Sequence, residues 1–155
     1  MKEVVIYTDG ACTGNPGPGG YGAILSYGKG RKEISGGFEM TTNNRMEIIA
    51  AIKALEALRE PCMVKLYSDS RYLVDAIERK WVERWRQNGW KRNALENALN
   101  VDLWCRLLVL LEMHKVKFIW VKGHADNVEN ERCDELAREA IAAGVLDVDE
   151  GYVTP

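Results

Sequence analysis

Two apolar, strand-like segments of this 155-residue chain end in almost the same way. Residues 4–8 (VVIYT) run into Asp9, and residues 64–68 (VKLYS) run into Asp69. The helical segment between them makes the two strands parallel neighbours, whose carboxyl ends meet at one edge of a sheet. Neighbouring strands lie ~4.8 Å apart. Two unit charges at about 5 Å repel by roughly 3 kcal/mol at an effective dielectric of about 20, so the pattern predicts a cation between the two aspartates.

The order of the other segments predicts an α/β fold with a five-stranded mixed sheet and helices on both faces. The first three strands, at 4–10, 21–27 and 33–40, form an antiparallel meander, and the glycine-rich stretch at 14–20 is interpreted as a turn. Strands 1, 4 and 5 are parallel. Helices are expected at about 43–59, 70–80, 101–114 and 128–143, and the later strands at 64–70 and 116–121.

Composition indicates a single domain over residues 1–155, with a loose acidic tail at about 144–155. The net charge of −2 argues against a protein that binds nucleic acid through overall positive charge. The four cysteines are widely spaced and only two histidines are present, so a zinc cage is not indicated. No apolar run approaches the ~20 residues that span a bilayer. We therefore expect a cytoplasmic, monomeric protein without a membrane segment.

Two further acids are candidates for the same edge of the sheet. Glu47 shares an apolar stripe of the first predicted helix, and Asp134 shares one of the last. An acid on an apolar face is unfavourable unless it is paired. The alternative is that each acid is solvated or paired with a nearby arginine, Arg45 or Arg138. Four carboxylates without a cysteine or histidine cluster favour Mg²⁺, or Mn²⁺ in its place, over zinc, and two such ions about 4 Å apart suit in-line attack on a phosphodiester.

Several motifs resemble ribonuclease H of the bacterial type 1 class. They are YTDGACTGNPG at 7–17, TNNRME at 42–47, YSDS at 67–70, GH at 123–124 and NERCDELA at 130–137. The resemblance is collinear over nearly the whole chain. It implies the ribonuclease H-like fold and an endonuclease that hydrolyses the RNA strand of RNA/DNA hybrids. It also implies a two-metal-ion mechanism that leaves 5′-phosphate and 3′-hydroxyl ends.

The resemblance assigns roles to individual residues. It implies that the metal-binding acids are Asp9, Glu47, Asp69 and Asp134, and that His124 is a mobile catalytic histidine; the alternative is an ordinary loop histidine. The candidate substrate-binding residues are Cys12, Asn15, Thr42, Asn43, Asn44, Arg71, Trp81, Trp85 and Lys91. Arg71 departs from the family, which usually has Gln there, so one minor-groove contact is in doubt. The stretch 93–100 is less basic than in many members, so weaker binding of the hybrid is expected.

A basic, aromatic patch lies between the second and third predicted helices. Trp81 and Trp85 are interleaved with Lys80, Arg84 and Lys91 on an otherwise acidic protein. Such cations can pair with phosphates of a DNA strand, and the rings can pack on a sugar or base. The four-residue spacing of the two tryptophans is equally typical of core residues, so both interpretations stay open.

Three other functions are compatible with parts of the sequence. Another two-metal nuclease or strand-transfer enzyme on this scaffold would keep the acids but act on DNA through a different groove. A hybrid-binding module without catalysis would not need the acids and the histidine. The plainest alternative is an α/β protein whose acids are merely solvated.

Overall fold

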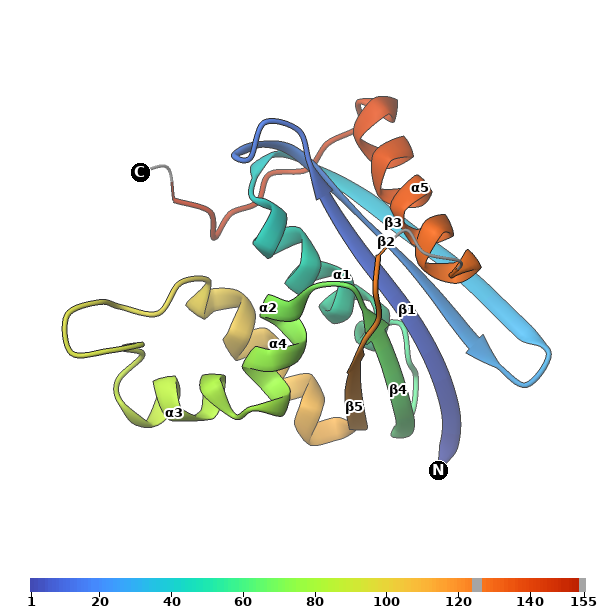
Figure 1. Ribbon diagram of the computed structural model, residues 1–155. Helices are drawn as coiled ribbons and strands as arrows, with labels where there is room; N and C mark the ends of the chain where they lie inside the picture. The colour runs from blue at the N-terminus through green and yellow to red at the C-terminus, as the bar shows by residue number, and fades with distance from the viewer. Residues whose placement is uncertain (124–126, 154–155) are drawn as a thin grey trace.

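The computed structural model describes residues 1–123 and 127–153 and contains one five-stranded sheet (Figure 1). The strands are β1 (Lys2–Cys12), β2 (Gly17–Tyr27), β3 (Gly30–Thr41), β4 (Cys62–Ser68) and β5 (Lys115–Trp120). The helices are α1 (Asn43–Glu56), α2 (Arg71–Glu78), α3 (Trp81–Gln87), α4 (Val101–Met113) and α5 (Val128–Ala143). The sheet order is β3-β2-β1-β4-β5. The first three strands are antiparallel and β1, β4 and β5 are parallel, which confirms the predicted topology.

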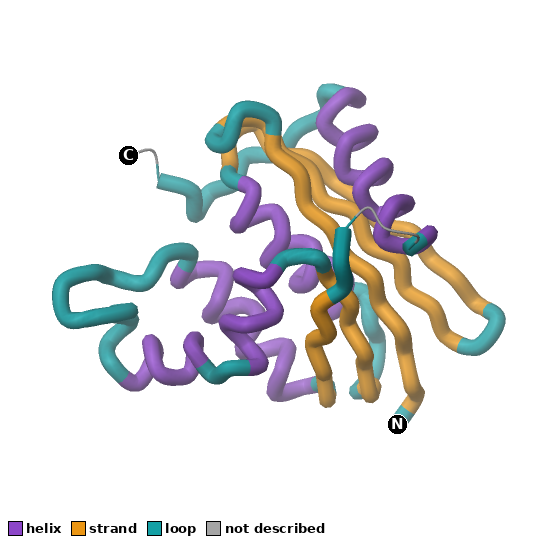
Figure 2. Tube along the Cα trace, in the orientation of Figure 1, coloured by secondary structure: helices purple, strands orange, loops and turns teal. Residues whose placement is uncertain are grey.

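Helices cover both faces of the sheet (Figure 2). α5 packs on one face; α1, α2 and α4 lie on the other, where α2 and α4 contact β5, and α3 packs on α2 (Figure 1). The main core lies under α1, where Ile6, Leu66 and Trp104 are fully buried. A smaller cluster under α5 contains Ile24 and Cys133. Among the described residues, no helix combines the length and the apolar character that crossing a bilayer requires.

The glycine-rich stretch is a helix-packing surface as well as a turn. β2 already begins at Gly17, so the prediction of a turn is wrong from that residue onward. A Cβ atom on Gly20 would lie 2.3 Å from the carbonyl oxygen of Ala137, and one on Gly22 would lie 2.3 Å from that of Cys133. Because only glycine leaves this space free, α5 can rest directly on β2.

The short helix α3 was not predicted from the sequence. It begins directly after Lys80, which has a left-handed φ of 63°, and it buries Val82. Seven residues are too few for a helical spacing to stand out in the sequence. The tryptophan-rich segment therefore has more regular structure than its composition indicates.

The acidic tail is anchored to the domain at Asp147 and Asp149 rather than loose at these residues. Asp147 exchanges two main-chain hydrogen bonds of 2.8 and 2.9 Å with β3. The buried carboxylate of Asp149 accepts hydrogen bonds from the Thr41 hydroxyl and the Arg45 guanidinium, both at 2.7 Å. The acidic composition indicated a solvated segment, and that prediction was wrong because one of its charges meets a buried arginine.

Candidate active site

Asp9 and Asp69 lie at the carboxyl ends of two parallel neighbours. β1 and β4 pair in register as far as Thr8 opposite Ser68, so the next residue of each chain segment is an aspartate. Parallel pairing therefore places the two carboxylates together at one edge of the sheet, as the matched strand endings predict.

Glu47 joins the two aspartates from α1. The helix begins after Thr42, whose side chain accepts a hydrogen bond from the Arg45 main-chain N–H at 3.2 Å. A Cβ atom on Gly10 would lie 2.6 Å from the Glu47 nitrogen, so only glycine allows α1 to pass so close to β1. That close approach brings Glu47 beside Asp9.

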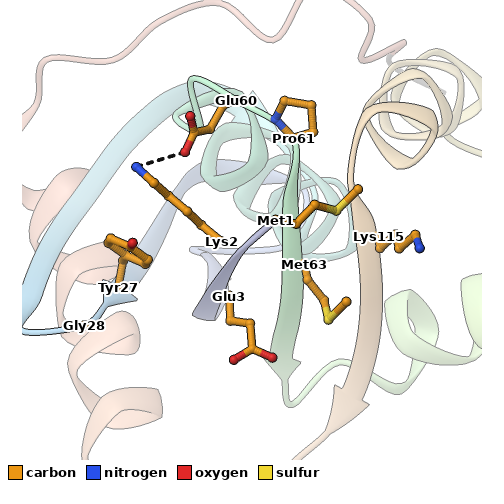
Figure 3. A pocket seen from close by; sticks show the side chains of 9 residues that line it. All are labelled: Met1, Lys2, Glu3, Tyr27, Gly28, Glu60, Pro61, Met63 and Lys115. Atoms are coloured by element: carbon orange, nitrogen blue, oxygen red, sulfur yellow. Dashed lines mark ion pairs between the residues drawn. The ribbon is translucent and has the colours of Figure 1, made fainter.

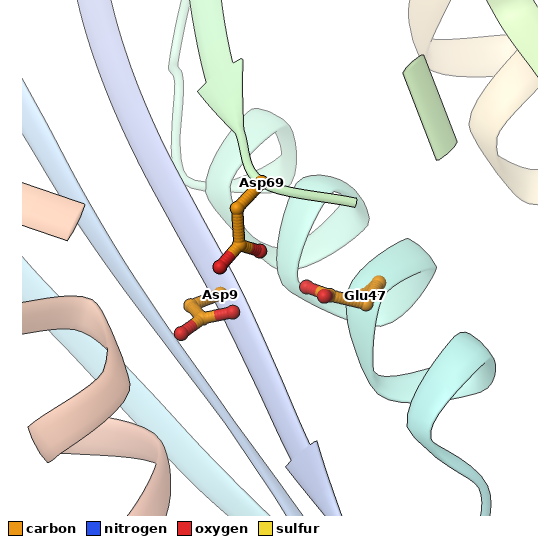
Figure 4. A group of neighbouring side chains, drawn as sticks. All are labelled: Asp9, Glu47 and Asp69. Carbon is orange, nitrogen blue, oxygen red and sulfur yellow. The ribbon is translucent and has the colours of Figure 1, made fainter. Parts of the chain in front are cut away.

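The three acids form one cluster (Figure 4). One carboxylate oxygen from each of Asp9, Glu47 and Asp69 lies within 4.8 Å of the other two. Asp9 and Glu47 are each 5% exposed, and Asp69 is half-buried. Asp9 Oδ1 accepts a hydrogen bond from the Gly10 N–H at 2.9 Å, whereas Glu47 Oε1 is buried without a hydrogen-bond partner among the described residues. Converging carboxylates, one of them with a buried oxygen that has no partner among the described residues, form an arrangement that a cation stabilises.

The electrostatics of the cluster point the same way. Burial, and after it the charges of Asp69 and Asp134, raise the pKa of Asp9 from an ordinary 3.8 to about 8. Burial, and after it the charges of Asp9 and Asp69, raise the pKa of Glu47 well above its ordinary 4.5. The protein without metal therefore holds protons in this pocket near neutral pH, which a divalent cation would displace.

Asp134 stands beside the cluster rather than in it. Its Oδ2 accepts hydrogen bonds from Arg138 at 2.8 and 2.9 Å, and among the described residues it is not part of the group of converging oxygens. Its charge nevertheless contributes to the raised pKa of Asp9. The arginine pairing considered as an alternative for Asp134 is thus present. The corresponding pair of Arg45 with Glu47 is not, because Arg45 binds two other acids.

His124 lies outside the described residues, so its role stays a prediction. The residue before it is closely packed on the cluster. A Cβ atom on Gly123 would lie 2.6 Å from Asp69 Oδ2, so a larger residue there would require the carboxylate to move.

Four of the predicted substrate-binding residues line one groove of about 680 Å³. They are Asn15, Thr42, Asn43 and Asn44, and the opposite wall contains residues 98–102 and 151–153. Asn15 Oδ1 accepts a hydrogen bond from the Asn43 main-chain N–H at 2.9 Å, which joins the loop after β1 to the start of α1. Cys12, also predicted here, turns its thiol to the carbonyl oxygens of Gly17 and Thr41 at 3.5 and 3.4 Å.

The remaining predicted contacts lie elsewhere on the molecule. Trp81, Trp85 and Lys91 line a second groove of about 370 Å³. Both tryptophans are partly buried and pack against the main core, so the core and surface interpretations each hold in part. Arg71 is separate from this groove; its guanidinium lies over the ring of Trp120 at 3.8 Å from the ring centroid.

Another cavity, of about 980 Å³, is at the other end of the sheet (Figure 3). It surrounds the start of β1, where Lys2 pairs with Glu60 at 2.9 Å and lies over the ring of Tyr27. Lys2 and Asp9 are seven steps apart along the extended chain, which is about 23 Å. None of the predicted site residues lines this cavity.

Comparison with known proteins decides the family. The family model described as RNase H matches residues 1–142. The chain belongs to the ribonuclease H family. It is therefore a metal-dependent endoribonuclease that hydrolyses RNA in RNA/DNA hybrids.

Individual relatives cover nearly the whole chain. The chain is 64% identical over 152 residues to "Ribonuclease H" of Syntrophus aciditrophicus (strain SB), which covers 98% of this chain and 88% of the relative. It is 59% identical over 152 residues to "Ribonuclease HI" of Synechocystis sp., covering 97% and 95%. Among solved structures, LC11-RNase H1 in complex with RNA/DNA hybrid matches with a TM-score of 0.71 and 26% identity, over 92% of this chain and 99% of that one.

Sequence reasoning missed the residues that support the acids of this ribonuclease H. Gly10 is needed because the main chain of α1 passes close to it, and Gly123 lies against the Asp69 carboxylate, which no local pattern reveals. Trp120 donates an indole hydrogen bond to the Asp69 carbonyl at 3.1 Å, a contact across two strands. Only its position at the end of a predicted parallel strand could have indicated that it lies near the site.

The raised pKa of Asp9 predicts how the stability of metal-free ribonuclease H depends on pH. The folded protein keeps a proton up to about pH 8, whereas the unfolded chain loses it near 3.8. The folded state thus binds more protons between these values, and the contribution of Asp9 to stability falls as the pH rises through that window. Asp9→Asn should remove this contribution, so the variant gains stability relative to wild type at high pH.

Urea unfolding with a chelator at about pH 5 and about pH 8 measures the effect. The difference between Asp9→Asn and wild type cancels the contributions of groups that do not interact with Asp9, and it reports on Asp9 together with Glu47, whose pKa the Asp9 charge raises. One of the groups that cancel is His114, whose pKa burial lowers, so that its own contribution is lost as the pH falls. A difference that is the same at both pH values would contradict the assignment.

Proposed function

We propose that this ribonuclease H works with two divalent ions, Mg²⁺ with Mn²⁺ as a substitute, held by Asp9, Glu47, Asp69 and Asp134. The observation that carries the proposal is the cluster of three carboxylates with oxygens within 4.8 Å of one another. The donors are oxygens only, and one of the buried ones has no partner among the described residues. Such hard donors in small number suit Mg²⁺, which keeps several of its own waters.

The position of each residue in the site suggests its role in catalysis. Bound ions of this kind supply an activated water and stabilise the leaving 3′ oxygen of the RNA. Asp9 and Asp69 lie together at the two strand ends and would hold the ion that activates the water. Glu47 adds a ligand from the α1 side. We assign proton transfer or product release to His124, because histidine is the side chain that exchanges protons near neutral pH. The products carry 5′-phosphate and 3′-hydroxyl ends.

Asp134 can join the metal ligands by leaving Arg138. The two residues are four apart on α5, and the Arg138 side chain is 63% exposed. Exposed pairs of this spacing contribute about 0.3–0.5 kcal/mol, far less than a carboxylate gains from a divalent ion. The pair therefore supports a ligand that is exchanged between an arginine and the metal.

Two surfaces fit the two strands of the hybrid. The groove that contains Asn15 and the start of α1 offers amide and hydroxyl groups, which can hydrogen-bond to phosphates and to the 2′-hydroxyl that only RNA has. The groove of Trp81, Trp85 and Lys91 offers cations and rings for the other strand. The solved complex of LC11-RNase H1 with RNA/DNA hybrid supports this class of substrate. A monomeric state and a cytoplasmic location stay predictions.

One substrate panel tests the proposal. Labelled RNA/DNA hybrid, double-stranded RNA and double-stranded DNA are incubated with the protein and Mg²⁺, Mn²⁺ or a chelator. We expect cleavage of the hybrid only, in the RNA strand, with 5′-phosphate ends and no reaction in the chelator. A rate that rises with the second power of Mg²⁺ concentration below saturation indicates two ions. Cleavage of double-stranded DNA would favour the alternative nuclease, and a first-power dependence would argue for one ion.

A further inference from the structure

The indole of Trp120 donates a hydrogen bond to the main-chain carbonyl of Asp69, just beyond the last main-chain bond between β4 and β5. The β4–β5 pairing ends with Ser68 opposite Trp120, and the Val121 N–H donates to the Ser68 carbonyl at 2.9 Å. The first carbonyl after β4, that of Asp69, accepts instead from the indole Nε1–H of Trp120 at 3.1 Å. A side-chain donor thus takes the place of a main-chain donor where the two strands diverge.

The residues on either side of Asp69 are fixed by local hydrogen bonds. The Ser70 N–H donates to Ser68 Oγ at 3.0 Å. Ser70 Oγ in turn accepts from the Leu73 N–H at 3.1 Å, which caps α2. The Trp120 indole binds the Asp69 carbonyl between these two bonded residues.

Arg71 holds the indole ring in place from the solvent side. Its guanidinium carbon lies 3.8 Å from the centroid of the Trp120 ring. Trp120 is 36% exposed, so its ring would otherwise be free to rotate into water. A cation stacked on an indole face is attracted by the electron density of the ring.

Asp69 is the acid of the cluster that most needs such support. Asp9 and Glu47 are each 5% exposed, and the packing of β1 and α1 around them leaves little freedom. Asp69 is only half-buried, so side-chain packing restrains it less than it restrains the other two acids. A main-chain restraint beside Asp69 compensates for this weaker packing.

We propose that Trp120, held by Arg71, is a positioning residue for metal binding at Asp69. It fixes the main chain of Asp69 so that the carboxylate faces Asp9 and Glu47 before a cation arrives. Cation binding then has no cost for ordering this ligand, so the affinity for the cation is higher. The inference rests on the proposed metal-binding role of Asp69.

Trp120→Phe tests the proposal because it keeps a ring for Arg71 and removes only the indole N–H. Mn²⁺ alone is titrated into the full chain and its dissociation constant is measured by calorimetry. Loss of a hydrogen bond of this kind predicts roughly two- to tenfold weaker binding. Hydrolysis should need correspondingly more Mg²⁺ and recover at saturating Mg²⁺, with the KM for hybrid unchanged. A merely structural role would show neither the metal dependence nor the recovery.

Two matched variants sharpen the test. Trp90→Phe removes an indole N–H for which the described residues offer no acceptor, so its Mn²⁺ affinity should equal that of wild type. Arg71→Lys keeps the charge and loses the planar stack, so Mn²⁺ binding should weaken, but less than in Trp120→Phe. The indole resonance of Trp120 should also shift in an NMR titration with Mg²⁺.

The outcomes separate this inference from the proposed function. If wild type binds Mn²⁺, Asp69→Asn does not, and Trp120→Phe binds as wild type does, the positioning role is overturned while the metal site stands. If wild type and Asp69→Asn bind Mn²⁺ equally, the metal-binding role of Asp69 fails, and the inference fails with it. Weaker binding in Trp120→Phe with normal binding in Trp90→Phe supports both.

Discussion

Asp9→Asn and Asp69→Asn should each lower the turnover of hybrid cleavage by at least about a thousandfold, because each removes several kcal/mol of transition-state stabilisation by the metal site. An amide offers one neutral oxygen where the carboxylate offers a charged one. The remaining acids still repel one another, but the charge that binds a divalent cation is reduced. Each strand end supplies one of the two aspartates, so the remaining aspartate cannot replace the carboxylate that is lost.

The fold should survive both substitutions. Asn has the shape of Asp, and at position 69 the contact with Trp120 uses the main-chain carbonyl, which Asn retains. At position 9 the change removes a charge that is unfavourable without metal, so the metal-free variant should be at least as stable as wild type at about pH 8. Loss of activity together with normal unfolding therefore identifies a chemical role.

Steady-state cleavage of a labelled hybrid at saturating Mg²⁺ measures the effect. Glu112→Gln is the matched control, because it makes the same change from acid to amide at an exposed position of α4 and should keep wild-type turnover. Either aspartate variant with turnover within tenfold of wild type would remove that residue from the metal site.

The strand endings predicted the central pair of acids because a rigid geometric rule connects them. Parallel pairing of β1 and β4 places Asp9 and Asp69 side by side at one edge of the sheet, independently of the rest of the chain. The apolar stripe on α1 predicted in the same way that Glu47 points inward, and it is buried. In both cases the period of the secondary structure carries the information.

Where the partner of a residue lies far along the chain, the sequence was less informative. The stripe on α5 shows which face Asp134 shares, but not that Arg138 is near enough to bind it. The glycines of β2 resemble turn residues until the packing of α5 on them is known. Asp149 meets Arg45 across 104 residues, and no local pattern marks either as a partner of the other.

Arg45→Met should destabilise the folded protein by about 3–5 kcal/mol, because removing one partner of a buried ion pair leaves the other charge without compensation. The Arg45 side chain is 4% exposed and donates to both oxygens of two carboxylates. Asp149 is its buried partner, with a side chain 5% exposed, and Asp102 is the more exposed one, at 43%. Methionine can fill the space of the aliphatic stem but cannot meet either acid.

The effect should reach the substrate groove as well. Arg45 connects α1, α4 and the acidic tail, and residues 151–153 of that tail line the groove beside Asn43 and Asn44. Without the Arg45 guanidinium, the buried Asp149 carboxylate is uncompensated, which favours movement of the tail into solvent. We therefore expect a raised KM for hybrid in Arg45→Met at a temperature where the variant is still folded, with a smaller change in turnover at saturating substrate.

Urea unfolding of wild type, Arg45→Met and Arg106→Met separates a buried from an exposed pair. Arg106 binds Glu56 at 3.3 Å with both side chains more than 40% exposed, so the same substitution there should cost less than about 1 kcal/mol. Adding Asp149→Leu to Arg45→Met removes the stranded charge and should restore part of the lost stability. Equal unfolding free energies for the two single variants would show that the buried arginine does not hold the tail, and a double variant no more stable than Arg45→Met would exclude the uncompensated carboxylate as the cause.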